Sequence, residues 1–267
     1  MSKIGRALDH ADLSLEESTG NVRHIPWSEE EETPEPYEKK VVYTRTQVVP
    51  RRDDHLEKNR IMSHLDDLSV VDHYNLLRTQ ILQRTRESGR NSIMITSVNP
   101  GEGKTVTAIN LAISISREIR QTALLVDMNL RNPKVSEYMN LEKGRGVANY
   151  LMGEEAVSDL LVNPDLAKMV VFPSGKPITG STEILGSPRM AQLVRELKNR
   201  YEDRYVIYDC PHILNMPDSL VFSSYVDGVV LVVEAGKTSL DDVHRAVQLL
   251  DKDKVIGIVM NKARKAA

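Results

Sequence analysis

The chain has 267 residues, 40% of them hydrophobic, which is enough for one large domain or two small ones with a sizeable core. Its formal net charge of −3 at pH 7 excludes a strong general attraction to nucleic acid or to an acidic membrane surface. The longest apolar run, Val229–Val233, is far too short to cross a bilayer, and the single cysteine, Cys210, excludes an internal disulfide framework, so we expect a cytoplasmic protein.

Residues 1–60 differ in composition from the rest of the chain. Apolar residues at helical spacing predict a short amphipathic helix over residues 3–13, which is either a docking element for a partner or a frayed terminus. The acidic run Glu29–Glu32 and the charged, proline-containing stretch after it hold too little apolar surface to offset the entropy of ordering. We therefore predict a largely disordered arm up to residue 60, followed by one domain over residues 61–267.

A strand, a glycine loop and a helix then follow in the order of a phosphate-binding loop. After a predicted helix over residues 67–87, the apolar run Ile93–Thr96 predicts a buried strand, and a helix begins at Lys104. Glycines in such a loop let backbone N–H groups face phosphate oxygens, and the helix N-terminus adds partial positive charge. The residues predicted to bind the nucleotide here are Pro100, Gly101, Glu102, Gly103, Lys104, Thr105 and Val106. Val98 stands where the full GxxxxGK[ST] pattern has its first glycine, so an ordinary glycine turn is the alternative.

Strands and helices alternate through the rest of the chain. The predicted strands are Thr122–Val126, Met169–Phe172, Tyr205–Tyr208, Gly228–Val233 and Val255–Met260, and the predicted helices begin at Ser187-Pro188, Met216 and Leu240. This alternation, with nearly continuous apolar strands, predicts a doubly wound α/β domain with a mostly parallel sheet. Ligands of such sheets bind beyond the carboxyl ends of the strands, where the sequence places Gly101–Thr105, Asp127, Asp209 and Asn261.

The side chains at these strand ends suit phosphoryl transfer. Lys104 is expected to contact the β- and γ-phosphates, while the Thr105 hydroxyl and the Asp209 carboxylate hold Mg²⁺. We expect Lys104 to keep the pKa of Asp127 low, so that an ionised Asp127 can orient a hydroxyl or water and accept its proton. The alternative is that Asp127 only caps the end of its strand. Lys104, Asp127 and Asp209 are thus the predicted catalytic residues.

Three segments resemble motifs of the bacterial tyrosine kinases of capsule and exopolysaccharide synthesis. TSVNPGEGKT, LLVDMNLR and VIYDCPH resemble the Walker A, Walker A′ and Walker B motifs of that family in order and spacing. The resemblance implies a P-loop NTPase of the deviant-Walker type that uses ATP and Mg²⁺ to phosphorylate protein tyrosines. It also implies a homo-oligomer, a contact between Asn261 and adenine, and an inner-membrane polysaccharide co-polymerase as the partner that holds the protein at the membrane.

The metal-binding residues depart from the family pattern. Asn129 replaces the second aspartate of D-x-D-x-R, and an amide ligates a metal without contributing charge. Binding of Mg²⁺ by Thr105, Asn129 and Asp209 is therefore expected to be weakened. His212 replaces the second of two prolines after the Walker B strand, and we interpret it as a substitution at the rim of the site.

Features outside the site also depart from the family. The E-x-x-R-x-x-R pattern that family members use between subunits is reduced to Asp72, Asn75 and Arg78, and no tyrosine-rich tail follows Tyr225. The acceptor tyrosines are therefore an open question. Among the tyrosines, Tyr37 and Tyr43 are candidates because they lie in the predicted arm.

Two other functions compete with a kinase. One is an ATP-switched regulatory ATPase of the same polysaccharide machinery, with catalysis weakened by Asn129. The other is an ATPase of the division-site or plasmid-partition type, which has a signature lysine where this chain has Asn99-Pro100 and which commonly carries a basic amphipathic C-terminal helix. Both features are missing from the sequence, so a kinase or its weakened relative is the favoured prediction.

Overall fold

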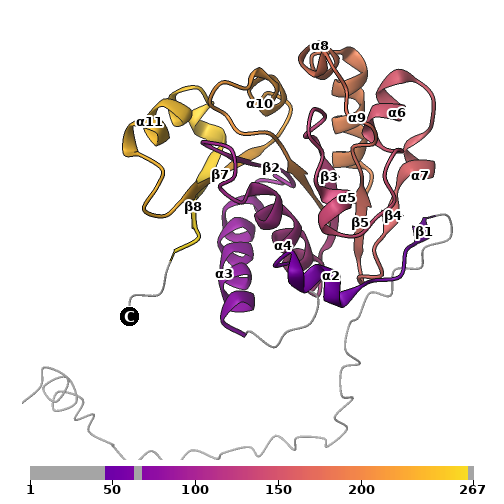
Figure 1. Cartoon of the computed structure of the whole chain (residues 1–267), viewed down its shortest axis with the longest axis horizontal. Helices are drawn as coiled ribbons and strands as arrows, with labels where there is room; N and C mark the ends of the chain where they lie inside the picture. Colours follow the sequence, from indigo (N-terminus) through magenta and orange to yellow (C-terminus); the bar gives the residue numbers. More distant parts are fainter. Residues whose placement is uncertain (1–45, 63–67, 264–267) are drawn as a thin grey trace, which may run out of the picture. The chain divides into compact units, whose positions relative to one another are not determined.

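The protein contains one extended sheet with helices on both faces (Figure 1). This computed structural model describes residues 46–62 and 68–263. The strands are β1 (Gln47–Val48), β2 (Ser92–Ser97), β3 (Thr122–Asp127), β4 (Val162–Asn163), β5 (Met169–Phe172), β6 (Arg204–Asp209), β7 (Gly228–Glu234) and β8 (Val255–Asn261). The strands are hydrogen-bonded in the order β1-β4-β5-β3-β6-β2-β7-β8, and all neighbouring pairs are parallel except β4 with β5. The predicted mostly parallel, doubly wound sheet is confirmed.

Ten α-helices lie among the described residues. They are α2 (Asp53–Lys58), α3 (Leu68–Thr85), α4 (Lys104–Ser116), α5 (Val135–Tyr138), α6 (Val147–Met152), α7 (Val157–Leu160), α8 (Ser181–Leu185), α9 (Pro188–Asn199), α10 (Pro217–Ser223) and α11 (Leu240–Gln248). The predicted start at Ser187-Pro188 is confirmed, because the Ser187 side chain accepts a hydrogen bond from Met190 N. No helix in the described ranges is long and apolar enough to span a membrane.

Two apolar cores sandwich the sheet, and alternate residues of the same strand enter opposite cores. On β3, Leu124 and Val126 pack with α6 to α11, whereas Ala123 and Leu125 pack with α2 to α5. This two-residue alternation follows from the pleat, and burial on both faces explains why the strands are apolar throughout. Helices α3 and α4 lie side by side on one face (Figure 1).

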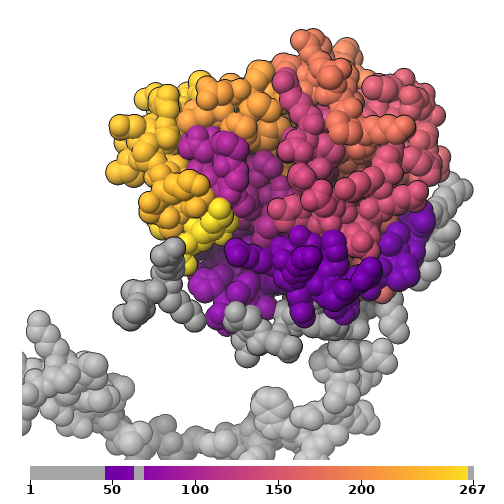
Figure 2. Space-filling view, viewed as in Figure 1, coloured from indigo at the N-terminus to yellow at the C-terminus, as the bar shows by residue number. Residues whose placement is uncertain are grey.

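Residues 46–62 form a strap on the domain, and the prediction that residues 46–60 are disordered is wrong. Leu56, Ile61 and Met62 are buried in the core that includes α3 and α4. The buried side chain of Asn110 in α4 fixes the strap at two points, because Asn110 Oδ1 accepts from Met62 N and Asn110 Nδ2 donates to Arg60 O, each at 2.9 Å. Figure 2 shows the indigo strap lying against the neighbouring surface. The folded domain therefore extends to residue 46; the helix predicted over 3–13, the acidic run, Tyr37 and Tyr43 lie outside the described residues.

Candidate functional site

The predicted phosphate-binding loop connects β2 to α4 at the carboxyl edge of the sheet. Strand β2 lies between β6 and β7, and the loop ends at Gly103, directly before the first residue of α4. Gly101 and Gly103 have φ values of +80° and +97°, a backbone region that residues with a Cβ rarely adopt. A Cβ on Gly103 would also lie 2.1 Å from Asn261 Nδ2. The two glycines therefore allow the main chain to turn back into the N-terminus of α4.

Lys104, Thr105 and Asp209 meet at this N-terminus. Thr105 Oγ1 donates a 2.7 Å hydrogen bond to Asp209 Oδ2, and Lys104 Nζ lies 3.6 Å from Asp209 Oδ1 and 3.1 Å from Thr105 Oγ1. Asp209 is completely buried at the end of β6, whereas the Lys104 side chain is 14% exposed. Burial raises the pKa of Asp209, against the opposing effects of Lys104 and Thr105. Lys104 and Thr105 of the loop and Asp209, more than a hundred residues later, thus form one cluster.

This cluster is suited to Mg²⁺. Within the described part of the chain, Asp209 Oδ1 is buried, has no hydrogen-bond partner and lies 3.6 Å from Lys104 Nζ, so it has lone pairs left for a metal ion. Thr105 Oγ1 is a second oxygen next to it, and hydroxyl and carboxylate oxygens are ligands that Mg²⁺ takes in nucleotide sites. The arrangement therefore fits the predicted metal residues Thr105 and Asp209, and Asn129 lines the adjoining cavity.

A cavity of about 350 Å³ opens in front of the cluster. Of the residues predicted to bind nucleotide or metal, its walls include Pro100, Gly101, Gly103, Lys104, Thr105, Val106 and Asn129. Residues from the segments after β3 and β6 complete the walls, namely Arg131, Asn132, Lys134, Tyr138, Pro211, His212 and Met216. Glu102, Asp127, Asp209 and Asn261 are not among the wall residues. Loop glycines and cations thus face a space of the kind that a phosphate chain requires.

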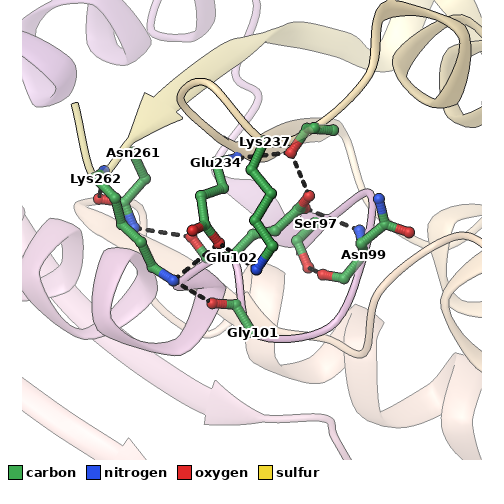
Figure 3. Close-up of polar contacts among 9 residues, drawn as sticks. Ser97, Asn99, Gly101, Glu102, Glu234, Lys237, Asn261 and Lys262 are labelled. Carbon is green, nitrogen blue, oxygen red and sulfur yellow. Dashed lines mark hydrogen bonds and ion pairs between the residues drawn. The ribbon is translucent and has the colours of Figure 1, made fainter.

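Glu102 and Asn261 instead hold the loop in place (Figure 3). Glu102 is buried, and its carboxylate accepts hydrogen bonds from Asn99 N and Thr238 Oγ1. Asn261 Nδ2 donates to the carbonyl of Glu102 at 2.9 Å. The Glu102 carboxylate and carbonyl are therefore occupied, which leaves its backbone N–H for a nucleotide, and the predicted part of Glu102 in nucleotide binding stays a prediction. The contact between Asn261 and adenine stays a prediction.

Lys262 adds a further tie to the same loop. Its Nζ donates to Gly101 O at 2.8 Å and pairs with Glu234 Oε2 at 3.0 Å (Figure 3). The loop is thereby fastened to the ends of β7 and β8. Lys262 and Thr238 could not be predicted as supports, because nothing local in the sequence shows that three distant segments meet around Glu102.

Asp127 is enclosed at the end of β3. It is completely buried, and its carboxylate accepts three backbone hydrogen bonds, from Asn129 N to Oδ1 and from Lys134 N and Val135 N to Oδ2, at 3.0 to 3.1 Å. Asp127 thus fastens the segment between β3 and α5, as in the capping alternative. Its predicted role as the proton acceptor stays a prediction.

The expectation of a low pKa for Asp127 is wrong. Burial, and next the charge of Asp209, raise the pKa of Asp127 to about 7, while the backbone hydrogen bonds and Lys104 oppose this rise. The sequence shows that Lys104 is near but does not show that water is excluded. Desolvation of the carboxylate outweighs the attraction of Lys104.

This raised pKa predicts how the stability of the metal-free protein depends on pH. Between pH about 4 and 7 the native state holds a proton on Asp127 that the unfolded chain releases, so its contribution to the free energy of unfolding falls as pH rises, by at most ~1.4 kcal/mol per pH unit. The lowered pKa of His212 acts in the opposite direction, so the measured quantity is the difference between wild type and Asp127→Asn. Urea unfolding in EDTA from pH 4.5 to 7.5 should show wild type losing stability relative to the variant. Parallel pH profiles would contradict the raised pKa.

An ion pair that the sequence did not predict joins the exposed Arg131, at the cavity wall, to the buried Asp218. Arg131 donates from Nε and from its terminal nitrogen to the two carboxylate oxygens of Asp218, at 3.0 and 2.9 Å. Asp218 is completely buried at the start of α10 and also accepts hydrogen bonds from the hydroxyls of Ser181 and Thr182 in α8. The only sequence signal was the arginine of the Walker A′ segment. The pair joins the segment that carries Asn129 to two helices.

The helix before the loop makes internal contacts at two of the three positions related to the intersubunit pattern. Arg78 donates to Ser114 O at 2.8 Å, and Asn75 Oδ1 accepts from Ser114 Oγ at 2.9 Å. Both residues therefore attach α3 to α4 within the chain.

The loop, the cluster and the sheet define a class, the P-loop nucleoside triphosphatases. A family profile described as an AAA domain matches residues 90–257. Solved structures agree: the VpsO kinase domain gives a TM-score of 0.66 at 26% identity, covering 76% of this chain and all of that one. The kinase domain of the Escherichia coli tyrosine kinase ETK gives a TM-score of 0.69 at 24% identity. The match covers 85% of this chain and 94% of the ETK chain, and it supports the fold.

Curated relatives narrow the class to one family. The chain is 30% identical over 198 residues to the tyrosine-protein kinase CpsD of Streptococcus agalactiae, covering 73% of this chain and 84% of CpsD. It is 32% identical over 192 residues to the tyrosine-protein kinase YwqD of Bacillus subtilis, covering 71% and 80%. It also matches 22% of the succinoglycan biosynthesis transport protein ExoP of Rhizobium meliloti, at 29% identity. The chain belongs to the bacterial tyrosine-protein kinase family of CpsD and YwqD.

Proposed function

We propose that this chain is an ATP-dependent protein-tyrosine kinase that regulates the polymerisation and export of an exopolysaccharide or capsule. The observation that carries the proposal is the cluster of Lys104, Thr105 and Asp209, in which a buried carboxylate oxygen without a hydrogen-bond partner faces a hydroxyl and an ammonium group. Membership in a family whose curated members are tyrosine-protein kinases supports it.

The residues of the cavity have distinct roles in this proposal. Backbone N–H groups of residues 101–105 and the N-terminus of α4 bind the phosphate chain, and Lys104 reaches the β- and γ-phosphates. Thr105, Asn129 and Asp209 would hold Mg²⁺, which when bound neutralises charge on the phosphate oxygens. Arg131 and Lys134 line the same cavity, where they are paired with the carboxylates of Asp218 and Glu137, so Lys104 is the cation assigned to the negative charge of the transition state.

The partner and the location belong to the same proposal. The chain matches a short part of ExoP, a protein named for succinoglycan transport, which supports a separate membrane co-polymerase as the partner of this chain. We propose that this partner holds the kinase at the cytoplasmic face of the inner membrane, and that the kinase forms a homo-oligomer. With a net charge of −3 it is not expected to bind nucleic acid.

Phosphotyrosine formation tests the function. The purified chain, mixed with the cytoplasmic segment of its co-polymerase and Mg·ATP, should acquire phosphotyrosine detectable by antibody and mass spectrometry. Binding of ATP without any phosphotyrosine would favour the alternative, an ATP-switched regulatory ATPase of the same machinery. That alternative rests on Asn129, which lines the cavity but lacks the negative charge that an aspartate would offer to Mg²⁺.

Asn129→Asp should distinguish an active kinase from a weakened one. The added carboxylate would line the same cavity as Thr105, so we expect the apparent affinity for Mg²⁺ to rise roughly 10-fold to 100-fold. The measurement is the Mg²⁺ dependence of phosphotyrosine formation, with the exposed Asn140→Asp as the matched control. Phosphotyrosine in both wild type and variant supports a kinase. If only Asn129→Asp forms phosphotyrosine, the native protein has lost the activity. An unchanged Mg²⁺ dependence in Asn129→Asp would show that residue 129 is not a metal ligand.

A further inference from the structure

A second cavity, of about 1050 Å³, opens where β7 and β8 end. Its wall consists of residues 234–237 at the end of β7, residues 262 and 263 after β8, and Arg60. Arg60 belongs to the strap, which precedes the segment that the family profile matches. Figure 2 shows the yellow end of the described chain close to the indigo strap. The cavity thus brings the strap together with two strand ends of the nucleotide-binding edge.

This second cavity adjoins the phosphate-binding loop. Gly101 lines the first cavity, and its carbonyl accepts the 2.8 Å hydrogen bond from Lys262, which lines the second (Figure 3). Asn261, directly before Lys262, holds the carbonyl of the next loop residue, Glu102. The loop therefore borders both cavities.

The position of the second cavity suits the adenosine part of a nucleotide. Because β2 lies between β6 and β7, the loop after β2 has Asp209 on one side and the second cavity on the other. The metal, the terminal phosphate and the acceptor hydroxyl all need the side of Asp209, so the adenosine has to leave the loop on the side of β7 and β8. The volume is sufficient, because pockets for ligands of drug size have about 300–1000 Å³.

Arg60 brings an unpaired cation to this cavity. The carboxylate of Glu234 is already paired, with Lys262 at 3.0 Å and with Lys237 at 3.4 Å. Arg60 is exposed, and its guanidinium makes no hydrogen bond or ion pair with any residue that the structure describes. A guanidinium is planar and stacks on aromatic rings, and a purine base is such a ring.

The main chain of Arg60 is anchored in an unusual conformation. Its φ is +60°, which glycine and asparagine adopt after a helix more readily than arginine, so the backbone gives no reason for an arginine here. Arg60 N donates to Glu57 O at 2.8 Å, and Arg60 O accepts from Asn110 Nδ2 at 2.9 Å. Asn110 belongs to α4, the helix that begins at the phosphate-binding loop. Arg60 is therefore attached to the element that binds the phosphates, while its side chain is free for a ligand.

We propose that Arg60 of the strap binds the purine base of the nucleotide by stacking its guanidinium on the ring. The inference rests on the ATP site of the proposed function and not on phosphate transfer to tyrosine. By linkage, a nucleotide that contacts Arg60 stabilises the docked strap, and the docked strap strengthens nucleotide binding by the same factor. A ligand that has phosphates but no base should have neither effect.

The test compares two ligands of the full chain by isothermal titration calorimetry, a non-hydrolysable ATP analogue and tripolyphosphate, both with Mg²⁺. Arg60→Ala should raise the Kd for the ATP analogue about 5-fold to 30-fold, as expected for a lost cation–π contact, and leave the Kd for tripolyphosphate within about twofold. Lys58→Ala, at another exposed position of the strap, is the matched control and should bind both ligands as wild type does. In wild type, the ATP analogue but not tripolyphosphate should slow hydrogen exchange at the amides of Arg60 and Ile61.

The outcomes separate this inference from the kinase function. An unchanged Kd for the ATP analogue in Arg60→Ala would overturn the inference and leave the kinase function standing. An equal rise of Kd for both ligands would show that Arg60 acts on the phosphates or on the fold, and would also overturn it. If wild type forms no phosphotyrosine but binds the ATP analogue through Arg60, the kinase function is overturned and the inference stands. Failure of wild type to bind the ATP analogue would overturn both.

Discussion

Replacing Lys104 with methionine is expected to lower phosphotyrosine formation by at least ~10³-fold. Lys104 is the ammonium group at the N-terminus of α4, 3.6 Å from Asp209 Oδ1, and it lines the cavity for the phosphate chain. Methionine keeps most of the side-chain length but removes the charge that balances the γ-phosphate in the transition state. Initial rates of ³²P transfer from ATP, in the presence of the co-polymerase segment, measure the effect.

Lys176→Met is the matched control for this change. Lys176 is exposed and forms no ion pair with any residue that the structure describes, so its loss should leave the rate unchanged. A thermal melt of Lys104→Met must also show a cooperative transition, so that loss of fold is separated from loss of chemistry. A folded Lys104→Met protein that transfers phosphate at more than a tenth of the wild-type rate would refute the assignment of the site.

Asp218→Asn is expected to lower the free energy of unfolding by about 2–4 kcal/mol, the largest loss of stability among the substitutions considered. The completely buried Asp218 carboxylate accepts two hydrogen bonds from Arg131 and one each from Ser181 and Thr182. An amide provides one acceptor oxygen and directs two N–H groups at existing donors. For a domain of this size the loss corresponds to a lower Tm by roughly 4–12 °C, measurable by calorimetry.

The pH dependence of this contribution has a definite sign. Burial alone would raise the pKa of Asp218, but the hydrogen bonds from Arg131, Ser181 and Thr182 lower it below its usual value. The stability that Asp218 contributes is therefore complete above pH about 4 and is lost as pH falls through its lowered pKa. Wild type and Asp218→Asn should accordingly become more similar in stability below that pH.

Asp165→Asn is the matched control for Asp218→Asn. Asp165 is exposed and has a φ of +57°, a conformation that asparagine also tolerates, so a change within about 0.5 kcal/mol is expected. An equal effect of the two substitutions would show that the Arg131–Asp218 pair does not stabilise the fold. A stable Asp218→Asn protein with slower phosphotransfer would instead show that the pair serves to position the segment of Asn129.

Much of the candidate site could be predicted because its requirements are local. The glycines at positions 101 and 103 adopt positive φ values, and Lys104 and Thr105 must begin the helix that follows them. Asp209 could be placed because an apolar strand in a parallel sheet delivers its last residue to the carboxyl edge. The order of strands and helices followed from the same alternation.

The tertiary structure decided whatever depends on segments distant in the sequence. Residues 46–60 have too few apolar side chains to predict order, yet Leu56 is buried beside α4 and Asn110 binds the strap backbone on both sides of Ile61. The sequence predicts Glu102 as part of a nucleotide-binding loop, but its side chain accepts a hydrogen bond from Thr238, more than a hundred residues later.

The sequence by itself determined the chemical groups at the strand ends and therefore the class of site. Only the tertiary structure decided the surroundings of each group: it enclosed Asp127 among three backbone N–H groups and placed Arg60 of the strap in one cavity with the ends of β7 and β8. The physical reason is that the identity of a side chain is a local property, whereas its desolvation and its hydrogen-bond partners come from distant segments that pack around it.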